Sequence, residues 1–258
     1  EIVNPDVLYR NYFYRSSTND TMKKDLKNVV DRVLEIGKPD PHDIVVDIGS
    51  NDCTLLNYYQ KELKLVGFEP AKNIKFIDEG KNIKIFSSYF NAQNFIENFG
   101  EKAKIITSCA MFYDLENPKK FVQDIKNIMD KNGIWCVQIS YLLLMIKNLN
   151  FYDICHEHLS YYSIDSFEKL IEQFDLKIFY AETNTVNGGS IRLYVCRKEC
   201  KKYNQKKFQD ELDILRQEEN KYYLKDENTF FNFQKKIDRL KNKINSYINN
   251  IIKDKKIV

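Results

Sequence analysis

Short runs of β-branched and other apolar residues alternate, through the middle of the chain, with stretches whose apolar residues recur at helical spacing. This alternation is typical of βαβ units, in which helices connect parallel strands and cover both faces of the sheet. The sequence therefore predicts a doubly wound α/β fold with a mostly parallel sheet. The expected strands are Ile44 to Ile48, Leu65 to Phe68, Lys84 to Phe86, Lys104 to Thr107, Ile134 to Ile139, Leu176 to Tyr180 and Ser190 to Cys196.

The chain divides into three parts by its sequence pattern. Residues 1–40 are expected to form an N-terminal arm and an entry helix, which begins after the cap-forming residues 17–19 and ends at Gly37. Residues 41–200 hold the alternating strands and helices of the main domain. Residues 201–258 are expected to form a helical extension.

The N-terminal arm carries an aromatic cluster ahead of the entry helix. Such a cluster either covers a ligand or docks the arm onto the core, and docking is the favoured interpretation. The cluster consists of Tyr9, Tyr12, Phe13 and Tyr14. In the extension, apolar residues from Ile237 to Ile251 recur every three or four positions and predict one long amphipathic helix. Its apolar stripe needs a partner, so we expect a homo-oligomer formed through this helix.

Charge and hydropathy exclude several classes of partner. The formal net charge of +3 is spread over mixed Lys, Glu and Asp sequence, without the basic stripe that a phosphate backbone requires, so no nucleic-acid partner is expected. The longest apolar stretch, Ile134 to Ile146, is interrupted by polar residues and is too short to span a bilayer. No secretory leader opens the chain, and its six cysteines contain no CxxC pair. A cytoplasmic location without a membrane partner is therefore expected.

The loop after the first expected strand, Asp47 to Cys53, has the features of a nucleoside site. In open parallel sheets ligands bind beyond the carboxyl ends of the strands, where Gly49 permits close backbone approach. Glu69 ends the second expected strand, where its carboxylate can accept hydrogen bonds from ribose hydroxyls. The single glycine does not match a GxGxxG signature and favours a nucleoside without a pyrophosphate. A tight turn in another kind of α/β protein remains the alternative.

Two of the three histidines lie in the segment Cys155-His156-Glu157-His158 after the fifth expected strand. Histidine is suited to general acid and base catalysis near neutral pH, and an adjacent glutamate can orient it. The spacing lacks the i, i+4 geometry of a helical HExxH site, so no metal site is predicted. A solvated loop without a catalytic role remains the alternative.

Taken together, these motifs resemble the sugar C-methyltransferase family, whose members methylate a carbon next to the ketone of a nucleotide-linked keto-deoxysugar. The resemblance covers most of the chain and is most specific in the ICHEHLSYYS and NGGSIR runs. Its segments are Tyr14 to Thr18, Asp47 to Leu56, Ala110 to Leu115, Tyr152 to Ser163 and Asn187 to Arg192. It implies a class I, Rossmann-like methyltransferase domain that uses S-adenosylmethionine and releases S-adenosylhomocysteine.

The resemblance also implies roles for individual residues. A base removes the proton α to the ketone, and the resulting enolate attacks the methyl group of the cofactor. His158 is the expected base, Glu157 its partner or a ligand to a sugar hydroxyl, and His156 could exchange roles with His158. The residues expected at the cofactor are Asp47, Gly49, Asn51, Asp52, Glu69, Pro70, Ala110 and Met111. Those expected at the sugar-nucleotide acceptor are Tyr14, Tyr113, Asn187, Ser190 and Arg192.

The chain departs from the family pattern at two cysteines. Cys53 stands where the family loop usually has a glycine, and its side chain either crowds the cofactor or points into the following helix. Cys155 stands where some members have a tyrosine, so no role is carried over to it. Members also have a zinc-binding domain before this region and a second α/β domain after it, which would begin near 256–258, so the chain is expected to be a fragment.

Two other functions fit the same motifs. The first is methylation of an oxygen or nitrogen on a different small metabolite, in which the same base would deprotonate a hydroxyl. The second is a domain without catalytic activity, which binds the cofactor, or nothing, and serves in assembly.

Overall fold

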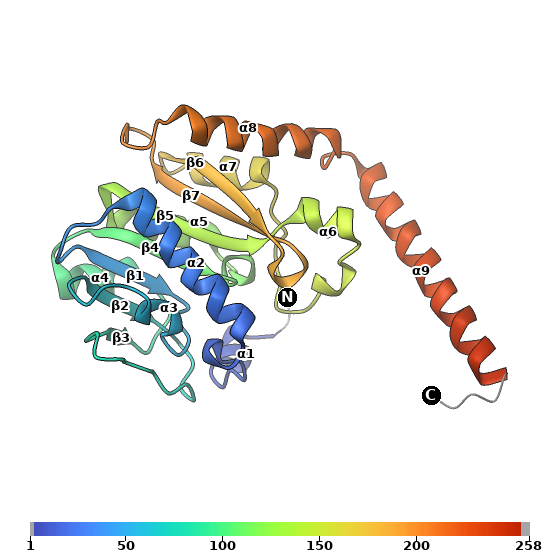
Figure 1. Cartoon of the computed structure of the whole chain (residues 1–258), viewed down its shortest axis with the longest axis horizontal. Helices are drawn as coiled ribbons and strands as arrows, with labels where there is room; N and C mark the ends of the chain where they lie inside the picture. Colours follow the sequence, from blue (N-terminus) through green and yellow to red (C-terminus); the bar gives the residue numbers. More distant parts are fainter. Residues whose placement is uncertain (1–2, 254–258) are drawn as a thin grey trace.

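The computed structural model, which describes residues 3–253, contains a seven-stranded sheet with the order β3-β2-β1-β4-β5-β7-β6 (Figure 1). The first five strands are parallel, and β7 runs antiparallel to both of its neighbours. The strands are β1 Ile44–Ile48, β2 Lys64–Phe68, β3 Lys84–Phe86, β4 Ala103–Cys109, β5 Met129–Ser140, β6 Leu176–Asn184 and β7 Ser190–Arg197. The prediction of a mostly parallel, doubly wound α/β fold is confirmed.

Helices cover both faces of this sheet (Figure 1). Because side chains alternate between the faces of a strand, Val45 packs with α2 and α3, whereas Ile44 and Val46 pack with α4, α5 and α7. The helices are α1 Pro5–Tyr9, α2 Asp20–Gly37, α3 Thr54–Asn57, α4 Ala92–Phe99, α5 Pro118–Ile128, α6 Leu142–Asn148, α7 Ile164–Glu172, α8 Lys206–Lys221 and α9 Glu227–Lys253. Single 3-10 turns occur at η1 Ser16–Thr18, η2 Phe112–Asp114, η3 Phe151–Asp153 and η4 Val186–Gly188.

The entry helix α2 begins and ends close to where its sequence predicts. The Asn19 side chain accepts hydrogen bonds from the backbone N–H groups of Thr21 and Met22 and so satisfies two donors of the first turn. Gly37 is the last helical residue, and Lys38 follows it in the left-handed region, as is common after a helix. One face of α2 is buried against the sheet, which fixes the direction in which the N-terminal arm leaves the helix.

The two C-terminal helices differ in their packing. Phe208 and Leu212 of α8 are buried against the core, whereas α9 projects away from the sheet (Figure 1). Several apolar side chains of α9, including Phe231 and Ile252, are exposed. The strand expected near 256–258 lies outside the described residues. No helix within residues 3–253 is long and apolar enough to cross a membrane.

Loops that could hold a ligand meet where the parallel strands end. β2 and β3 follow β1 on one side of it, and β4 and β5 lie on its other side, so the strand order reverses at β1. The carboxyl ends of such strands bound the crevice in which open α/β sheets bind ligands. The loops that follow Ile48, Phe68 and Cys109 therefore lie around one place at the carboxyl edge of the sheet.

Candidate active site

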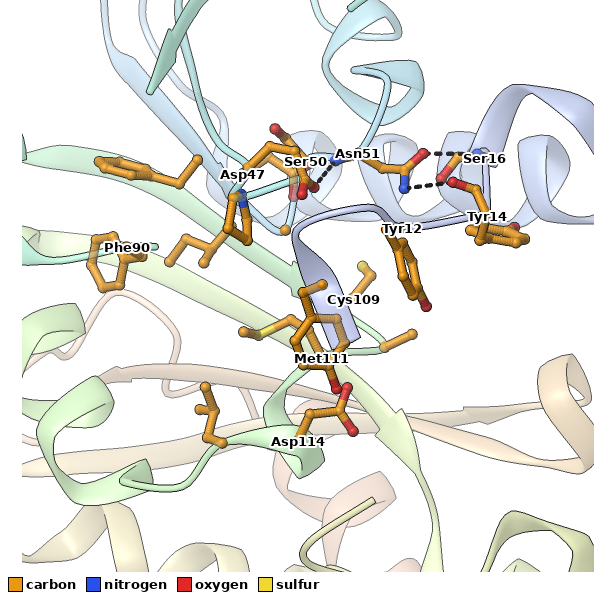
Figure 2. Close-up of a pocket in the computed structure, with 18 of the residues that line it drawn as sticks. Tyr12, Tyr14, Ser16, Asp47, Ser50, Asn51, Phe90, Cys109, Met111 and Asp114 are labelled. Carbon is orange, nitrogen blue, oxygen red and sulfur yellow. Dashed lines mark hydrogen bonds between the residues drawn. The ribbon is translucent and has the colours of Figure 1, made fainter. Parts of the chain in front are cut away.

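A cavity of about 570 Å³ lies at the carboxyl ends of β1, β2 and β4, a size that suits a small-molecule ligand. Its walls combine the loops after these strands with the N-terminal arm, which folds back over them (Figure 2). Among the described residues that line it there are four carboxyl side chains and no lysine, arginine or histidine. The cavity is therefore suited to a neutral or cationic ligand rather than to a phosphate.

The turn after β1 brings the backbone close to the cavity. Gly49 has φ +74°, and a Cβ built on it would lie 3.4 Å from the Cγ atom of Met111. Both the left-handed conformation and the close approach favour glycine at this position. Asn51 follows with φ 50°, and its backbone N–H donates a 2.8 Å hydrogen bond to Oε2 of Glu69.

Glu69 is held from both sides at the end of β2. Its Oε1 accepts a hydrogen bond of 2.8 Å from the backbone N–H of Ala71, in addition to the bond from Asn51. Burial raises the pKa of this carboxyl, and the two backbone donors offset part of that rise. Each carboxylate oxygen can accept more than one hydrogen bond, so both oxygens retain capacity for the hydroxyls of a ribose.

Asp47, at the penultimate position of β1, is nearly fully buried. The hydroxyl of Thr107 on β4 donates a 2.6 Å hydrogen bond to its Oδ1. Burial raises the pKa of Asp47 to about 7, although the Thr107 hydroxyl lowers it in part and Glu69 raises it further. A cation bound in the cavity would stabilise the charged form, and the ammonium and sulfonium groups of S-adenosylmethionine are such cations.

The N-terminal arm is tied down by the side chain of Asn51 (Figure 2). Its Oδ1 accepts a 3.0 Å hydrogen bond from the Ser16 N–H, and its Nδ2 donates a 3.2 Å bond to the Tyr14 carbonyl. Tyr9, Tyr12 and Tyr14 thereby line the cavity, whereas Phe13 is exposed. Docking alone, the favoured interpretation of the aromatic cluster, is therefore incomplete, because three of its four rings form cavity wall.

Four polar atoms of the lining are buried without a hydrogen-bond partner in the described part of the chain. They are the hydroxyl oxygens of Tyr9, Tyr14 and Ser50 and the Oδ1 atom of Asp114. Leaving a buried polar group unpaired costs about 1–3 kcal/mol, so such groups are normally satisfied. Their position around one cavity fits a polar ligand that supplies the missing partners.

The structure brings seven of the eight residues expected at the cofactor to the cavity lining. These seven are Asp47, Gly49, Asn51, Glu69, Pro70, Ala110 and Met111. Asp52 instead accepts hydrogen bonds from the Ser17 N–H at 2.9 Å and from the Thr54 hydroxyl at 2.6 Å. It therefore supports the loop and the start of α3 from outside the cavity.

Cys53 does not crowd this cavity. It has φ 69°, the left-handed conformation that explains why glycine is usual here, and its side chain is fully buried. It packs in the core cluster that contains Leu56 and Tyr59, and it is absent from the cavity lining. Of the two orientations expected for this side chain, the structure has the one directed into the protein.

The residues expected at the acceptor separate into two groups. Tyr14, Tyr113 and Asn187 line the cavity. The Ser190 hydroxyl donates a 3.0 Å hydrogen bond to the Val186 carbonyl and is buried. Ser190 thus braces the turn between β6 and β7 and does not reach the cavity.

Arg192 is also buried away from the cavity. Its guanidinium forms an ion pair with Asp25 of α2, with side chains 2% and 6% exposed, and its Nε donates a 2.5 Å hydrogen bond to Oε1 of Gln138. Gln138 itself lines the cavity and was not expected there. Arg192 therefore contacts the cavity lining through its hydrogen bond to Gln138. In the sequence, Gln138 lies within the apolar run of β5 and resembles an ordinary core residue.

The three residues of the His-Glu-His segment lie beside the cavity and not in its wall. The His158 ring centre is 4.3 Å from that of Tyr113, and its Nδ1 lies 2.8 Å from the Asp153 carbonyl oxygen. Since a carbonyl only accepts, Nδ1 carries the proton and Nε2 is left as the acceptor. His156 is exposed at the surface.

Glu157 is the member of this segment whose charge acts on the cavity. Its carboxylate contributes to raising the pKa of Tyr9, Tyr12 and Asp114, all of which line the cavity. The backbone N–H groups of Leu159 and Ser160 both donate to the Tyr113 carbonyl, at 2.9 and 3.0 Å. The segment is thus fixed against the turn η2.

Comparisons with known proteins agree with this arrangement. Residues 19–181 match the family described as "Methyltransferase domain", and residues 185–258 match the "C-methyltransferase C-terminal domain". The chain is 28% identical over 202 residues to C-methyltransferase NovU of Streptomyces niveus, a match that covers 75% of this chain and 47% of that protein. The chain therefore spans about half the length of this relative.

Solved methyltransferases share the fold. The magnesium protoporphyrin IX methyltransferase ChlM of Synechocystis PCC 6803, solved with bound S-adenosylhomocysteine, has a TM-score of 0.53 at 12% identity, covering 70% of this chain and 88% of ChlM. An S-adenosylmethionine-dependent methyltransferase of Clostridium acetobutylicum has a TM-score of 0.52 at 13% identity, covering 70% of this chain and 93% of that chain.

The methyltransferase match covers more than half of the chain, and the second match begins directly after β6. The cofactor of this family is S-adenosylmethionine, and the cavity at the carboxyl ends of β1, β2 and β4 has the residues to hold it. The chain therefore belongs to the S-adenosylmethionine-dependent methyltransferases, and its C-terminal part is similar to the C-methyltransferase C-terminal domain.

Proposed function

We propose that the protein transfers the methyl group of S-adenosylmethionine to the carbon α to the ketone of a nucleotide-linked keto-deoxysugar, through an enolate. The observation that carries this proposal is the junction of a cation-accepting cavity with the His-Glu-His segment, since Tyr113 lines the cavity on one side and contacts His158 on the other. The match to a C-methyltransferase domain supports carbon as the methylated atom.

The cofactor supplies a methyl group on a positively charged sulfur. We assign Asp47 to its ammonium end, because a buried carboxyl with a raised pKa gains most from a neighbouring cation. Glu69 is assigned to the ribose hydroxyls, Met111 and Ala110 to the border of the adenosine, and Gly49 to the close backbone approach. Asp52 is assigned a supporting role, through the loop that carries Asn51.

His158 is proposed as the base. A histidine whose Nδ1 proton is engaged by the Asp153 carbonyl presents Nε2 as the proton acceptor. The α-proton passes to Nε2, and the C–H electron pair enters the enolate. The enolate carbon then forms the new bond to the methyl carbon as the methyl C–S bond breaks, and the electron pair of that bond stays on sulfur. Glu157 is proposed as the partner of His158 or as a ligand to a sugar hydroxyl. His156 is the alternative base, and comparing His156→Asn with His158→Asn tests which of the two histidines has that role.

The phosphates of such an acceptor are proposed to lie outside the cavity. The described lining contributes four carboxyl groups and no cationic side chain, which repels a diphosphate. The sugar then enters between Tyr14, Tyr113 and Asn187, with its nucleotide toward the outside. Ser190 and Arg192, expected at the acceptor, are proposed to act indirectly, by bracing the β6–β7 turn and Gln138.

The test is the structure of the product. The protein is incubated with methyl-¹³C-labelled S-adenosylmethionine and a panel of nucleotide-linked keto-deoxysugars, and the product is examined by NMR. A new methyl signal at the high field typical of a C-methyl group, together with loss of turnover in His158→Asn, is the expected result. A methoxy or N-methyl signal from every accepted substrate would reject carbon methylation. Calorimetry with S-adenosylhomocysteine separates an enzyme from an assembly domain, because absence of binding would leave only the latter.

A further inference from the structure

Asp114, the last residue of the turn η2, faces the cavity from the side opposite to Asp47, Ser50 and Asn51, with Met111 between them (Figure 2). Its Oδ1 atom is buried and makes no hydrogen bond of good geometry among residues 3–253, although the Tyr9 hydroxyl lies close enough to interact with the carboxyl group. Within the same residues it forms no ion pair. A carboxyl group directed into a ligand cavity without a cation beside it is costly to ionise.

The proposed base His158 contacts Tyr113, the residue before Asp114. The other titratable groups around Asp114 come from the N-terminal arm, its own turn and the segment after η3, and these are neutral or acidic. They are Tyr9 of α1, Tyr12 of the arm, Tyr113 of its own turn, and Glu157 and Tyr161 of the segment after η3. Burial raises the pKa of Asp114 to about 8; the Tyr9 hydroxyl offsets part of this, and the Glu157 carboxylate adds to it. The group is therefore mostly protonated at neutral pH and can donate a hydrogen bond.

We propose that Asp114 is a catalytic residue that donates its carboxyl proton in a hydrogen bond to the ketone oxygen of the acceptor and stabilises that oxygen as the enolate forms. This inference rests on the proposed function, since it assigns one more group to the same acceptor. It also gives a partner in the ligand to a carboxyl group that otherwise has the Tyr9 hydroxyl beside it.

The electron balance of the step needs no further reactant. As the base takes the α-proton, the C–H pair becomes the new C=C bond and the carbonyl π pair moves onto oxygen, where the Asp114 O–H holds the developing charge. When the new C–C bond forms, the carbonyl is restored and the pair of the broken C–S bond stays on sulfur. Asp114 keeps its proton throughout and acts as a preorganised donor in a site shielded from water.

Donation fits Asp114 better than proton abstraction. An ionised Asp114 would face the negative charge of Glu157 without a compensating cation, whereas a protonated one faces it without repulsion. His158, which contacts Tyr113 beside Asp114, is already proposed as the base. In this proposal His158 removes the α-proton, and Asp114 stabilises the ketone oxygen.

Two variants separate donation from the alternatives. Asp114→Asn keeps a donor of the same shape but cannot act as a base, whereas Asp114→Ala removes the group. Enolisation is measured without methyl transfer, as exchange of the acceptor α-proton for deuterium in D₂O with S-adenosylhomocysteine bound. Loss of one such donor lowers a rate by about 10²- to 10³-fold, so we expect this loss for Asp114→Ala and a loss within about tenfold for Asp114→Asn. Asp31→Asn, on the exposed face of α2, is the matched control.

The pH dependence of the α-proton exchange rate is a second test. Exchange by the parent protein should fall as the pH rises through the pKa of Asp114, and this alkaline fall should be absent in Asp114→Asn. If Asp114→Asn is as inactive as Asp114→Ala, the group acts as a carboxylate and the proposal is overturned. It is equally overturned if Asp114→Ala retains full exchange activity.

Failure of the proposed function is distinguished by an experiment without any acceptor. The aspartate carboxyl carbons are labelled with ¹³C and titrated in the intact protein, with Asp114→Asn used to assign the signal. A titration midpoint above 7 supports a protonated donor, whereas a midpoint below 6 overturns it. If no sugar undergoes exchange or methylation, the proposed function fails, and this titration alone decides the state of Asp114.

Discussion

The Thr107 hydroxyl on β4 donates a 2.6 Å hydrogen bond to Asp47 on β1, so that neighbouring parallel strands fix the carboxyl at the floor of the cavity. This bond orients Asp47 but does not neutralise it. Because the described lining of the cavity has no cationic side chain, binding of a cationic ligand should favour the ionised form of Asp47. The pair of strands β1 and β4 thereby positions a group of the proposed binding site.

Binding of S-adenosylhomocysteine should depend on pH through Asp47. Its pKa in the free protein is about 7, and the ammonium group of the ligand lowers it in the complex. Binding therefore releases a proton at low pH, and the affinity should rise between pH 5.5 and 7 and level off above it. Calorimetry in buffers of different ionisation enthalpy measures the release, and an affinity that is constant over this range would contradict the assignment. Asp47→Asn should bind about 10- to 100-fold more weakly, the effect of losing a hydrogen bond to a charged group.

Gly49→Ala should weaken ligand binding. The left-handed conformation at φ +74° costs an alanine about 1–2 kcal/mol, and its Cβ would press on Met111. Gly80→Ala is the matched control, because φ is +76° and no atom lies within 4 Å of the added Cβ. Both variants should lower the melting temperature, but only Gly49→Ala should reduce affinity for S-adenosylhomocysteine. Equal affinities in the two variants would show that the turn does not approach the ligand.

Cys53→Gly should leave ligand affinity unchanged within about twofold, because the Cys53 side chain lies in the core. Its effect on stability is the sum of two opposed terms, relief of the left-handed backbone and loss of buried packing. Calorimetry and thermal unfolding measure the two properties separately. Binding that is tenfold tighter in Cys53→Gly would mean that the thiol does crowd the cofactor.

Arg192→Ala should destabilise the fold by about 3–5 kcal/mol, because it leaves the buried carboxyl of Asp25 without its partner. Arg216→Ala, which breaks more exposed pairs with Glu168 and Asp213, should cost no more than about 1 kcal/mol. Urea unfolding measures both. Adding Asp25→Asn to Arg192→Ala should recover part of the loss. A normal stability combined with a raised KM for the acceptor would instead support direct contact between Arg192 and the substrate.

Local patterns in the sequence were sufficient to predict the sheet and most of the loop residues that line the cavity after β1, β2 and β4. β1 is apolar except for Asp47, and the turn that follows needs Gly49, so both features are visible within a few residues. The start of β5 was less visible: Met129 pairs with Ala103, the register then shifts, and Ile134 pairs with Ile105. The irregular segment between them hides the first part of the strand.

Contacts between distant segments account for what the sequence did not reveal. Asn51 contacts Ser16, 35 residues earlier, and this and other contacts of the arm with distant loops make Tyr9 and Tyr12 part of the cavity wall. Asp114 lies in the segment Ala110 to Leu115 that carries the family resemblance, but the resemblance assigns no role to it. Arg192 is expected at the acceptor from the family resemblance, but in the structure it pairs with Asp25 of α2.

The antiparallel course of β7 has a consequence for how such an enzyme can diversify. Because β7 pairs antiparallel with β5 and β6, it begins at the edge at which the parallel strands end, and the β6–β7 turn that contains Asn187 lies at that edge. The residues proposed to hold the methyl donor follow paired strands, whereas two of those proposed for the acceptor, Tyr14 and Asn187, lie in the arm and in the β6–β7 turn, outside the sheet ladder. Substitutions in those two segments can change which molecule is modified while the machinery for the methyl donor is inherited intact.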